Sequence, residues 1–383
     1  MRKSYYIFLL IYCLCACQTS RKGEIYFSGE ELFLKKTDLV IKDTSLLGNY
    51  EMIPFELNKF SGIKTIDKIL LFEDKVGVVD LGLRAFFVFD RQGNFLYEIN
   101  HVGDGPGEYT QLLDVCLDPV DSCFVFLTFP KGILVYNYAD EFKYSIKLEE
   151  AAHKIAAQRI TVQGDYIYLL VPDRAGYDRQ EYSMMALNRR NGKKTYLLEQ
   201  GIRPVESLWT HGYSLVPGRD AVYYMQRYTH RIYKVKGEKC TPFYELNLGK
   251  FELPDHMLQE GLDKPRFMNE LSDRWSVFCL TNFCELPRGF MLSSNLPGLF
   301  YYDYQKEELD HFDGILNEDY GIELYSSTPV EPVGKDVAFI LDNLMLANMK
   351  EHRRETETPA LKALLDRLPD DPNPVLFLYS QKK

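Results

Sequence analysis

The sequence predicts an all-β protein, a six-bladed β-propeller built from four-stranded blades. Three observations carry this prediction: a repeat with a period in the mid-forties, an aromatic content of 14% with 27 Tyr and 24 Phe, and short apolar runs separated by polar turns. Aromatic and β-branched residues favour strands, and periods of about 40–50 residues are typical of propeller blades. A chain of 383 residues is also long for one ordinary domain, which favours an architecture that grows by repetition.

The repeating element is a strand that ends in Asp or Asn, followed by a polar turn and a second strand. Five copies are visible: FFVFDRQGNFLYEI (86–99), ILVYNYADEFKYSI (133–146), MMALNRRNGKKTYLLE (184–199), RIYKVKGEKCTPFYEL (231–246) and FYYDYQKEELDHF (300–312). Their aligned turn positions, Asp90, Asn137, Asn188, Lys234 and Asp303, are separated by 47, 51, 46 and 69 residues. The long last interval accommodates an insertion at about 251–275, for which we expect a short helix and a loop.

Each copy follows a further pair of apolar strands, such as KILLFEDKVGVVD (68–80), so that two strand pairs make one blade. The sixth blade is expected from DVAFI (336–340), NPVLFLYS (373–380) after a helical excursion at 341–367, and the N-terminal strand NYEMIPFEL (49–57). An N-terminal strand that joins the C-terminal blade closes the ring and removes two sheet edges. A seven-bladed ring would need strands that the chain does not offer. The predicted propeller spans residues 46–383.

The N-terminus predicts export. Arg2 and Lys3 precede the apolar run YYIFLLIYCL (5–14). This run has the length of a signal-peptide core and falls short of the roughly 20 apolar residues that a membrane-spanning helix needs.

The end of this segment, Leu14-Cys15-Ala16-Cys17, resembles the lipobox of bacterial lipoproteins. The resemblance implies removal of a signal peptide at residues 1–16 and acylation of Cys17, with residues 17–45 serving as a lipidated tether. An ordinary secretory signal is the alternative. No acidic cluster follows Cys17, so we expect an outer-membrane lipoprotein that faces the periplasm rather than the cell surface.

Composition narrows the function classes. A net charge of −10 without basic runs argues against nucleic acid as a partner. Five cysteines follow Cys17, namely Cys116, Cys123, Cys240, Cys279 and Cys284. Their odd number and spacing fit buried free thiols, although Cys116 and Cys123 flank a turn and could still form one disulfide.

The seven histidines are scattered and no G-x-S-x-G motif is present, so we expect no metal, no cofactor and no catalytic residue.

A family resemblance supports the fold. HVGDGPGEY (101–109) resembles the GPGEY signature of six-bladed β-propeller lipoproteins of Bacteroidota, relatives of NHL-repeat propellers. The segments YEMIPFEL (50–57), YELNLGKFELP (244–254) and DPNPVLFLY (371–379) resemble other recurring parts of that family. The resemblance covers roughly residues 45–380 and implies architecture and location without a settled activity.

Gly103, Gly105 and Gly107 of the 101–109 segment could also form a loop that binds phosphate. Such a loop needs a helix N-terminus directly after it, whereas a strand is expected after Tyr109. We therefore expect a tight turn in which the Glu108 carboxylate accepts local backbone hydrogen bonds.

Loops at one end of a propeller gather around the channel mouth and commonly bind ligands. The candidate ligand-binding residues in these loops are Arg84, His101, Arg174, Trp209, Arg227 and His230. This mixture of cations and aromatic rings suits a glycan, a peptide or a protein partner bound without catalysis. The alternative is a propeller hydrolase or lyase, lactonase-like or glycan-lyase-like, with its active site at the channel mouth. A sensor or assembly subunit is a third hypothesis.

Overall fold

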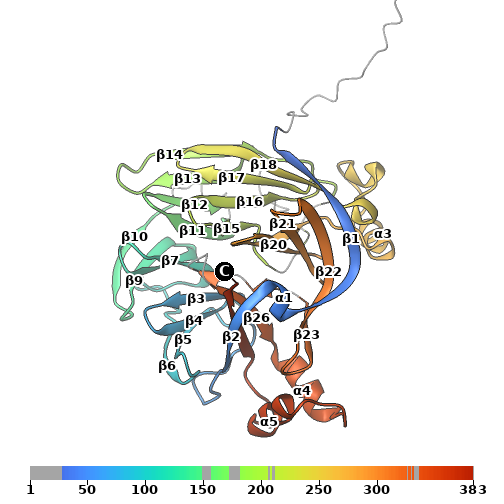
Figure 1. The fold of residues 1–383 in the computed structure, drawn as a ribbon. Helices are drawn as coiled ribbons and strands as arrows, with labels where there is room; N and C mark the ends of the chain where they lie inside the picture. Colours follow the sequence, from blue (N-terminus) through green and yellow to red (C-terminus); the bar gives the residue numbers. More distant parts are fainter. Residues whose placement is uncertain are drawn as a thin grey trace, which may run out of the picture.

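The computed structural model describes residues 28–148, 157–171, 182–205, 208, 212–325, 327–328, 330–331 and 336–382. Within these ranges the chain consists mainly of strands, arranged in sheets around a common centre with short helices at the periphery (Figure 1). The predicted signal peptide and Cys17 lie outside the described residues. Among the described helices, none has the length and apolar character needed to span a bilayer.

Four-stranded antiparallel units recur along the chain. The first two contain β3 (Lys68–Phe72), β4 (Lys75–Asp80), β5 (Ala85–Asp90) and β6 (Phe95–Ile99), then β7 (Gln111–Asp118), β8 (Cys123–Phe129), β9 (Gly132–Asn137) and β10 (Phe142–Ile146). The third and fourth contain β11 (Arg159–Gln163), β12 (Tyr166–Leu170), β13 (Tyr182–Asn188) and β14 (Lys194–Glu199), then β15 (Leu215–Pro217), β16 (Val222–Gln226), β17 (Arg231–Lys236) and β18 (Lys239–Asn247). The fifth contains β19 (Leu280–Leu286), β20 (Gly289–Ser294), β21 (Leu299–Asp303) and β22 (Glu308–Asn317), with the short β23 (Ile322–Leu324) paired to β22.

The last unit combines the two ends of the chain. Its order is β24 (Ser327–Thr328), β26 (Asp336–Leu341), β27 (Val375–Gln381) and β2 (Leu47–Pro54). The short β25 (Val330–Glu331) crosses to the first unit and pairs in parallel with β3. The antiparallel pairing of β2 with β27 agrees with the prediction that an N-terminal strand joins the C-terminal strands.

The repeat seen in the sequence is the outer strand pair of these units. Its aligned polar position lies at the end of β5, β9, β13 and β21 and inside β17. The side chains explain the preference for Asp and Asn: Asp90 Oδ1 accepts the N–H groups of Gln92 and Asn94, both at 2.9 Å. Asn137 Oδ1 bonds Glu141 N at 2.8 Å in the same way. Such side-chain bonds to the backbone stabilise the turn.

The hydrophobic core is divided into clusters that lie between consecutive units. Between the first two units, Phe86 packs edge-on against Phe124, with ring centroids 4.8 Å apart. The last unit packs on the first in the same manner, because Ile53 and Leu376 share a cluster with Val78. These face-to-face contacts give the structure its propeller-like form.

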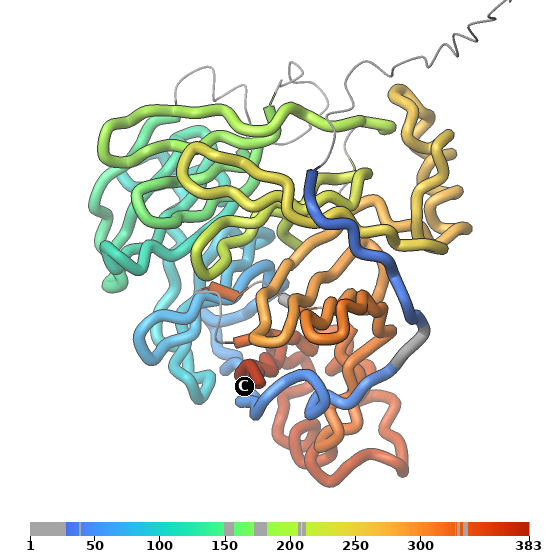
Figure 2. The backbone as a smooth tube through the Cα atoms, turned by 45° about the horizontal axis from the view of Figure 1, so that its top comes forward, coloured from blue at the N-terminus to red at the C-terminus, as the bar shows by residue number. Residues whose placement is uncertain are grey.

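The N-terminal strand β1 (Glu30–Lys42) differs from the tether expected for residues 17–45. Residues 30–33 of β1 pair in parallel with β18, and residues 34–42 pair in parallel with β22. One strand thereby joins the fourth and fifth units into a single ten-stranded sheet. Figure 2 shows this segment, in blue, following the rim of the molecule. The folded part of the chain therefore begins upstream of residue 46.

A buried polar cluster fixes this N-terminal segment to the fifth and the last units. The short helix α1 (Asp43–Leu46) follows β1 and carries Asp43, which is 3% exposed. Asp43 Oδ2 accepts Asn317 Nδ2 at 3.0 Å and the Tyr379 hydroxyl at 2.9 Å. Since Asn317 lies in β22 and Tyr379 in β27, the cluster connects three segments that are distant in sequence.

Both expected helical regions are present. The 251–275 insertion contains η2 (Asp255–Leu258) and α3 (Lys264–Arg274), with η1 (Gly249–Phe251) at its start. The Asp263 carboxylate caps α3 by accepting Arg266 N at 3.0 Å. Between β26 and β27 lie α4 (Asn343–Glu351) and α5 (Pro359–Arg367), and Leu346 and Leu364 pack into the adjoining core.

All five described cysteines are free thiols. Cys116 lies opposite Val125 in the β7–β8 pairing, and Cys123 lies opposite Asp118, so the two thiols do not face each other across the hairpin. Burial raises the pKa of the Cys240 thiol to about 12 and does the same for Cys284, which keeps both protonated at neutral pH.

Candidate functional site

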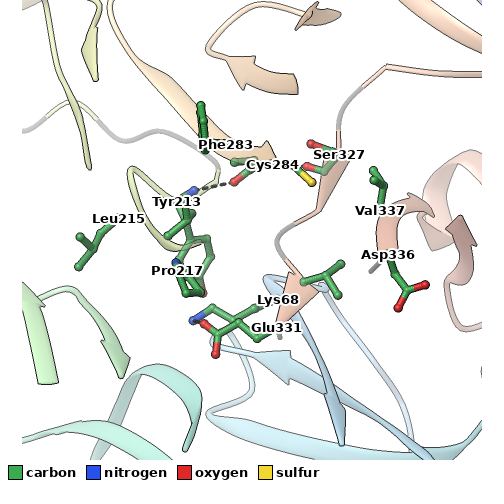
Figure 3. A pocket seen from close by; sticks show the side chains of 13 residues that line it. Lys68, Tyr213, Leu215, Pro217, Phe283, Cys284, Ser327, Glu331, Asp336 and Val337 are labelled. Atoms are coloured by element: carbon green, nitrogen blue, oxygen red, sulfur yellow. Dashed lines mark hydrogen bonds and ion pairs between the residues drawn. The ribbon is translucent and has the colours of Figure 1, made fainter. Parts of the chain in front are cut away.

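Polar side chains from the innermost part of each unit meet at the centre of the molecule. These are Lys68 in β3, Asp114 in β7, Arg159 in β11, Tyr213 just before β15, Asn282 in β19 and Ser327 in β24. Figure 3 shows several of them around a central cavity. We call these six residues and Glu331 of β25 the central polar cluster.

The Lys68 ammonium is the centre of this cluster. Its Nζ lies 2.9 Å from Asp114 Oδ1, 3.2 Å from Glu331 Oε1 and 2.8 Å from the Val115 carbonyl oxygen. The side chain is 3% exposed, and those of Asp114 and Glu331 are 0% and 6% exposed. An ammonium has three donors, so these contacts use all of its hydrogen-bonding capacity.

The remaining carboxylate oxygens are also bonded. Asp114 Oδ2 accepts Ile160 N at 2.8 Å, and Glu331 Oε2 accepts Leu117 N at 2.9 Å. The Tyr213 hydroxyl donates to Asp114 Oδ1 at 3.1 Å. A buried charge is costly unless it is paired and hydrogen-bonded, and this arrangement satisfies both conditions.

The Tyr213 ring connects the cluster to the other units. Lys68 Nζ lies 4.6 Å and the Arg159 guanidinium carbon 4.2 Å from its centroid. The Tyr213 N–H donates to Asn282 Oδ1 at 2.8 Å, and Asn282 Nδ2 donates to the Ser327 carbonyl oxygen at 2.7 Å. A continuous set of contacts thus joins every unit at the centre.

Burial and charge shift the pKa values of this cluster. Burial alone would lower the pKa of Lys68, but Asp114 and Glu331 outweigh it and raise that pKa above its usual value. Burial raises the pKa of Glu331, although Lys68 opposes the shift. Burial likewise raises the pKa of the Tyr213 hydroxyl. Lys68 is therefore charged at neutral pH, and Tyr213 is a neutral donor.

The cavity beside this cluster is small. Its wall contains Lys68, Tyr213, Cys284 and Glu331 (Figure 3). Asn282 also lines it. The volume available to the centres of water molecules is about 30 Å³. A cavity needs roughly 10–15 Å³ on this measure to hold one water, so this space fits one or two waters and is too small for a sugar ring.

A second cavity lies between the third and fourth units. We call it the amide crevice, and the residues that define it are Gln158, Gln200, Gln226, Tyr224, Arg227 and Tyr228. Its volume available to water centres is about 50 Å³. Arg227, one of the residues selected from the sequence, thus lines a pocket, where its Nη1 donates to the Leu208 carbonyl oxygen at 2.9 Å.

Two other selected residues lie between the first and second units. Arg84 Nη1 donates to the Thr110 carbonyl oxygen at 3.2 Å. His101 Nε2 lies 2.7 Å from Asp140 Oδ1, and its ring stacks on Tyr136 with centroids 5.5 Å apart. His101 begins the 101–109 loop and Arg84 lies beside it, and neither residue lines the amide crevice.

His230 is buried, with 3% of its surface exposed. Its Nε2 lies 2.6 Å from the Val277 carbonyl oxygen and its Nδ1 lies 3.2 Å from Glu252 Oε2. Both ring nitrogens therefore contact the 249–279 region of the chain. Arg174 and Trp209 lie outside the described residues. Among the described residues, no group of three or more His, Cys, Asp or Glu side chains is arranged to hold a metal ion.

The GPGEY loop has the structural role expected from its sequence. Glu108 Oε2 accepts the Gly105 N–H at 2.7 Å, as predicted. Tyr109 is fully buried, and its hydroxyl donates to the Arg84 carbonyl oxygen at 2.8 Å. Gly107 has φ +73°, and the Tyr136 hydroxyl donates to its carbonyl oxygen.

Replacing Gly107 with alanine should destabilise the protein through both strain and crowding. A Cβ there would lie 2.8 Å from Phe142 Cγ, whereas at Gly164, with φ +56°, a Cβ would have no neighbour within 4 Å. Gly164→Ala therefore reports the backbone strain alone. We expect Gly107→Ala to exceed Gly164→Ala in loss of unfolding free energy by about 1–3 kcal/mol, measured by urea denaturation. Equal losses would contradict the packing role of the loop.

Comparison with known proteins places this fold. The structure resembles that of a Bacteroides fragilis NCTC 9343 protein described as exported, with a TM-score of 0.73 and 16% identity, covering 92% of this chain and 100% of that one. It also resembles a member of the DUF4221 family from Bacteroides vulgatus ATCC 8482, with a TM-score of 0.55 and 9% identity over 88% and 97% of the two chains. At these identities the likeness concerns the fold alone. No curated protein matches the chain. The family described as a domain of unknown function, DUF4934, matches residues 31–380, and the chain belongs to that family.

Proposed function

We propose that this protein is a lipid-anchored, six-bladed β-propeller of the cell envelope that binds a glycan, peptide or protein partner without changing it chemically. Each four-stranded unit would be one blade, and β2 would close the ring by joining the last blade. The lipobox at residues 14–17 supports attachment through Cys17. We place the anchor in the outer membrane, and the absence of an acidic cluster after Cys17 favours its periplasmic face over the cell surface.

The state of the central polar cluster carries the non-catalytic part of this proposal. An active site combines perturbed pKa values with groups that a substrate can reach. Here Lys68, Asp114 and Glu331 are buried and bonded to one another and to the backbone. These interactions are those expected of groups that hold the sheets together. The amide crevice, in contrast, is lined by Gln158, Gln200 and Gln226 together with apolar and aromatic side chains of the third and fourth units.

The alternative is a hydrolase or lyase that acts at the channel mouth. A ligand screen that also examines the ligand separates the two functions. The full chain in detergent would be tested by thermal shift against oligosaccharides and peptides, and each ligand would be analysed by mass spectrometry after incubation. A ligand at 100 times its Kd should stabilise the fold by about 2.7 kcal/mol. We expect stabilisation with the ligand unchanged, and conversion of a ligand to a product would establish the enzyme alternative.

The anchor makes a prediction of its own. Cys17→Ser should abolish incorporation of radiolabelled palmitate and move the protein from the membrane to the soluble fraction, because the acyl chains supply most of the membrane affinity. Cys15→Ser changes a neighbouring cysteine and should retain both label and membrane attachment. Continued labelling of the Cys17→Ser protein would contradict anchoring at this residue.

A further inference from the structure

We propose that the amide crevice binds a neutral carbohydrate, with ligand hydroxyl groups contacting Gln158 and Gln200 and a sugar ring lying on the exposed Tyr182–Tyr196 pair. This inference rests on the proposed binding function and names its site and ligand class.

The glutamines give the crevice its chemistry. Gln200 Nε2 donates to the carbonyl oxygens of Tyr182 at 3.0 Å and Val171 at 3.4 Å, bonds that do not use its Oε1. Gln226 Oε1 accepts the hydroxyls of Tyr233 and Thr229, both at 3.2 Å, bonds that do not use its Nε2. A side-chain amide both donates and accepts hydrogen bonds. Sugar hydroxyls do the same, so the two kinds of group complement each other.

The size of the crevice favours hydroxyl groups over apolar side chains. Its volume of about 50 Å³ available to water centres holds only a few water-sized groups. A ligand that reproduces the hydrogen bonds of the waters it displaces retains their contribution to affinity. Hydroxyl groups meet this condition, whereas apolar side chains do not.

An exposed aromatic pair lies in the same four-stranded unit as Gln200. Tyr182 and Tyr196 are 37% and 41% exposed, and their ring centroids lie 5.8 Å apart. Gln200 is bonded to the Tyr182 backbone and so connects this pair to the crevice wall. Exposed tyrosines combine a flat apolar face with a polar hydroxyl, which matches the alternating C–H and O–H surface of a sugar ring.

The charge of the lining favours a neutral ligand. Arg227 is the one charged side chain among the described residues that line the crevice, and its guanidinium is bonded to the Leu208 carbonyl oxygen. No carboxylate lines the described wall, which disfavours a cationic ligand. Anion recognition typically depends on guanidinium groups that offer paired donors to the ligand.

The test uses the full chain in detergent and isothermal titration with short neutral gluco-, manno- and xylo-oligosaccharides, with oligogalacturonate as the anionic probe. Gln158→Leu and Gln200→Leu should each weaken binding of the tightest neutral probe at least tenfold. Gln163→Leu is the matched control, because Gln163 ends the strand β11 that Gln158 precedes and does not line the crevice. We expect its affinity to equal that of the unmodified protein. Thermal unfolding of each variant verifies that it is folded.

The outcomes separate failure of the crevice inference from failure of the proposed binding function. Neutral binding that both crevice variants weaken and the control leaves intact supports the inference. Neutral binding that neither variant changes would place the site elsewhere and leave the proposed function standing. Binding of oligogalacturonate alone would refute the ligand class, again without refuting a binding function. If none of these saccharides binds, the inference is refuted, and the proposed function then depends on a peptide or protein partner.

Discussion

Lys68→Met should lower the unfolding free energy by about 3–5 kcal/mol, the usual loss when one partner of a buried ion pair is removed. Methionine has a similar length but no charge, so Asp114 and Glu331 would remain buried and face each other without the cation between them. The Val115 carbonyl oxygen would also lose its donor. Urea denaturation followed by circular dichroism measures this loss.

The pH dependence of the stability of Lys68→Met follows from the pKa of Glu331. Its pKa is raised by burial in the unmodified protein, and removing Lys68 should raise it further, since Lys68 opposes the shift. A carboxyl group whose folded pKa lies above its unfolded value binds protons more readily in the folded chain. The contribution of Glu331 to stability is therefore fully present below about pH 4.5 and is lost as the pH rises through the folded pKa. The deficit of Lys68→Met should therefore be larger at pH 7.5 than at pH 5.

Two further variants separate this loss from a general effect of removing a lysine. Lys75→Met removes an ammonium that pairs with Glu73 near the surface, where its side chain is 25% exposed. Exposed pairs contribute little, so a change within about 0.5 kcal/mol is expected. Adding Glu331→Gln to Lys68→Met should recover part of the lost stability, because the uncompensated charge disappears. A Lys68→Met loss no greater than that of Lys75→Met would refute the structural role of the cluster.

The repeat and the helices could be predicted because their signals are local. Asp90 and Asn137 stabilise turns within four residues of themselves, so their chemistry appears in the sequence at the period of the units. The same holds for the Asp263 cap of α3. Such features depend on short-range geometry and are independent of how the units are arranged in space.

The central cluster could not be assembled from the sequence. Lys68 begins the apolar strand KILLF, and Asp114 interrupts the apolar strand QLLDVCLD. These charged residues in apolar strands are the signal available. Which charges meet depends on closure of the ring, since Glu331 lies 263 residues from Lys68. For the same reason the sequence could not show that His230, which directly precedes β17, is buried and contacts Glu252 and Val277.

The strand β1 was missed because its partners are remote. Its sequence EELFLKKTDLVIK begins with two acidic residues and contains adjacent lysines, a pattern typical of an exposed tether. Its parallel pairing with β18 and β22 depends on strands more than 200 residues away. The DUF4934 match begins at residue 31, within this strand, so the strand is part of the family domain.

The strand also gives the last prediction, a contrast between two neighbouring residues. Leu32 is 5% exposed and packs in the core cluster with Leu246, whereas Phe33 is 52% exposed. Leu32→Ala should lower the unfolding free energy by about 2–5 kcal/mol, as expected for a large-to-small change in a core. Phe33→Ala removes a larger side chain from the next position and should change stability by no more than about 0.5 kcal/mol.

Deleting residues 30–42 tests the pairing itself, because it uncovers the edges of β18 and β22 together. Unpaired edges associate with other chains, so the shortened protein should form oligomers or aggregates in size-exclusion chromatography with light scattering, whereas Phe33→Ala should elute as the unmodified chain does. If the deletion variant remains unassociated and as stable as the unmodified chain, β1 contributes neither edge protection nor core packing. If Leu32→Ala is destabilised and the deletion variant associates, β1 both packs into the core and covers the edges of the fourth and fifth units.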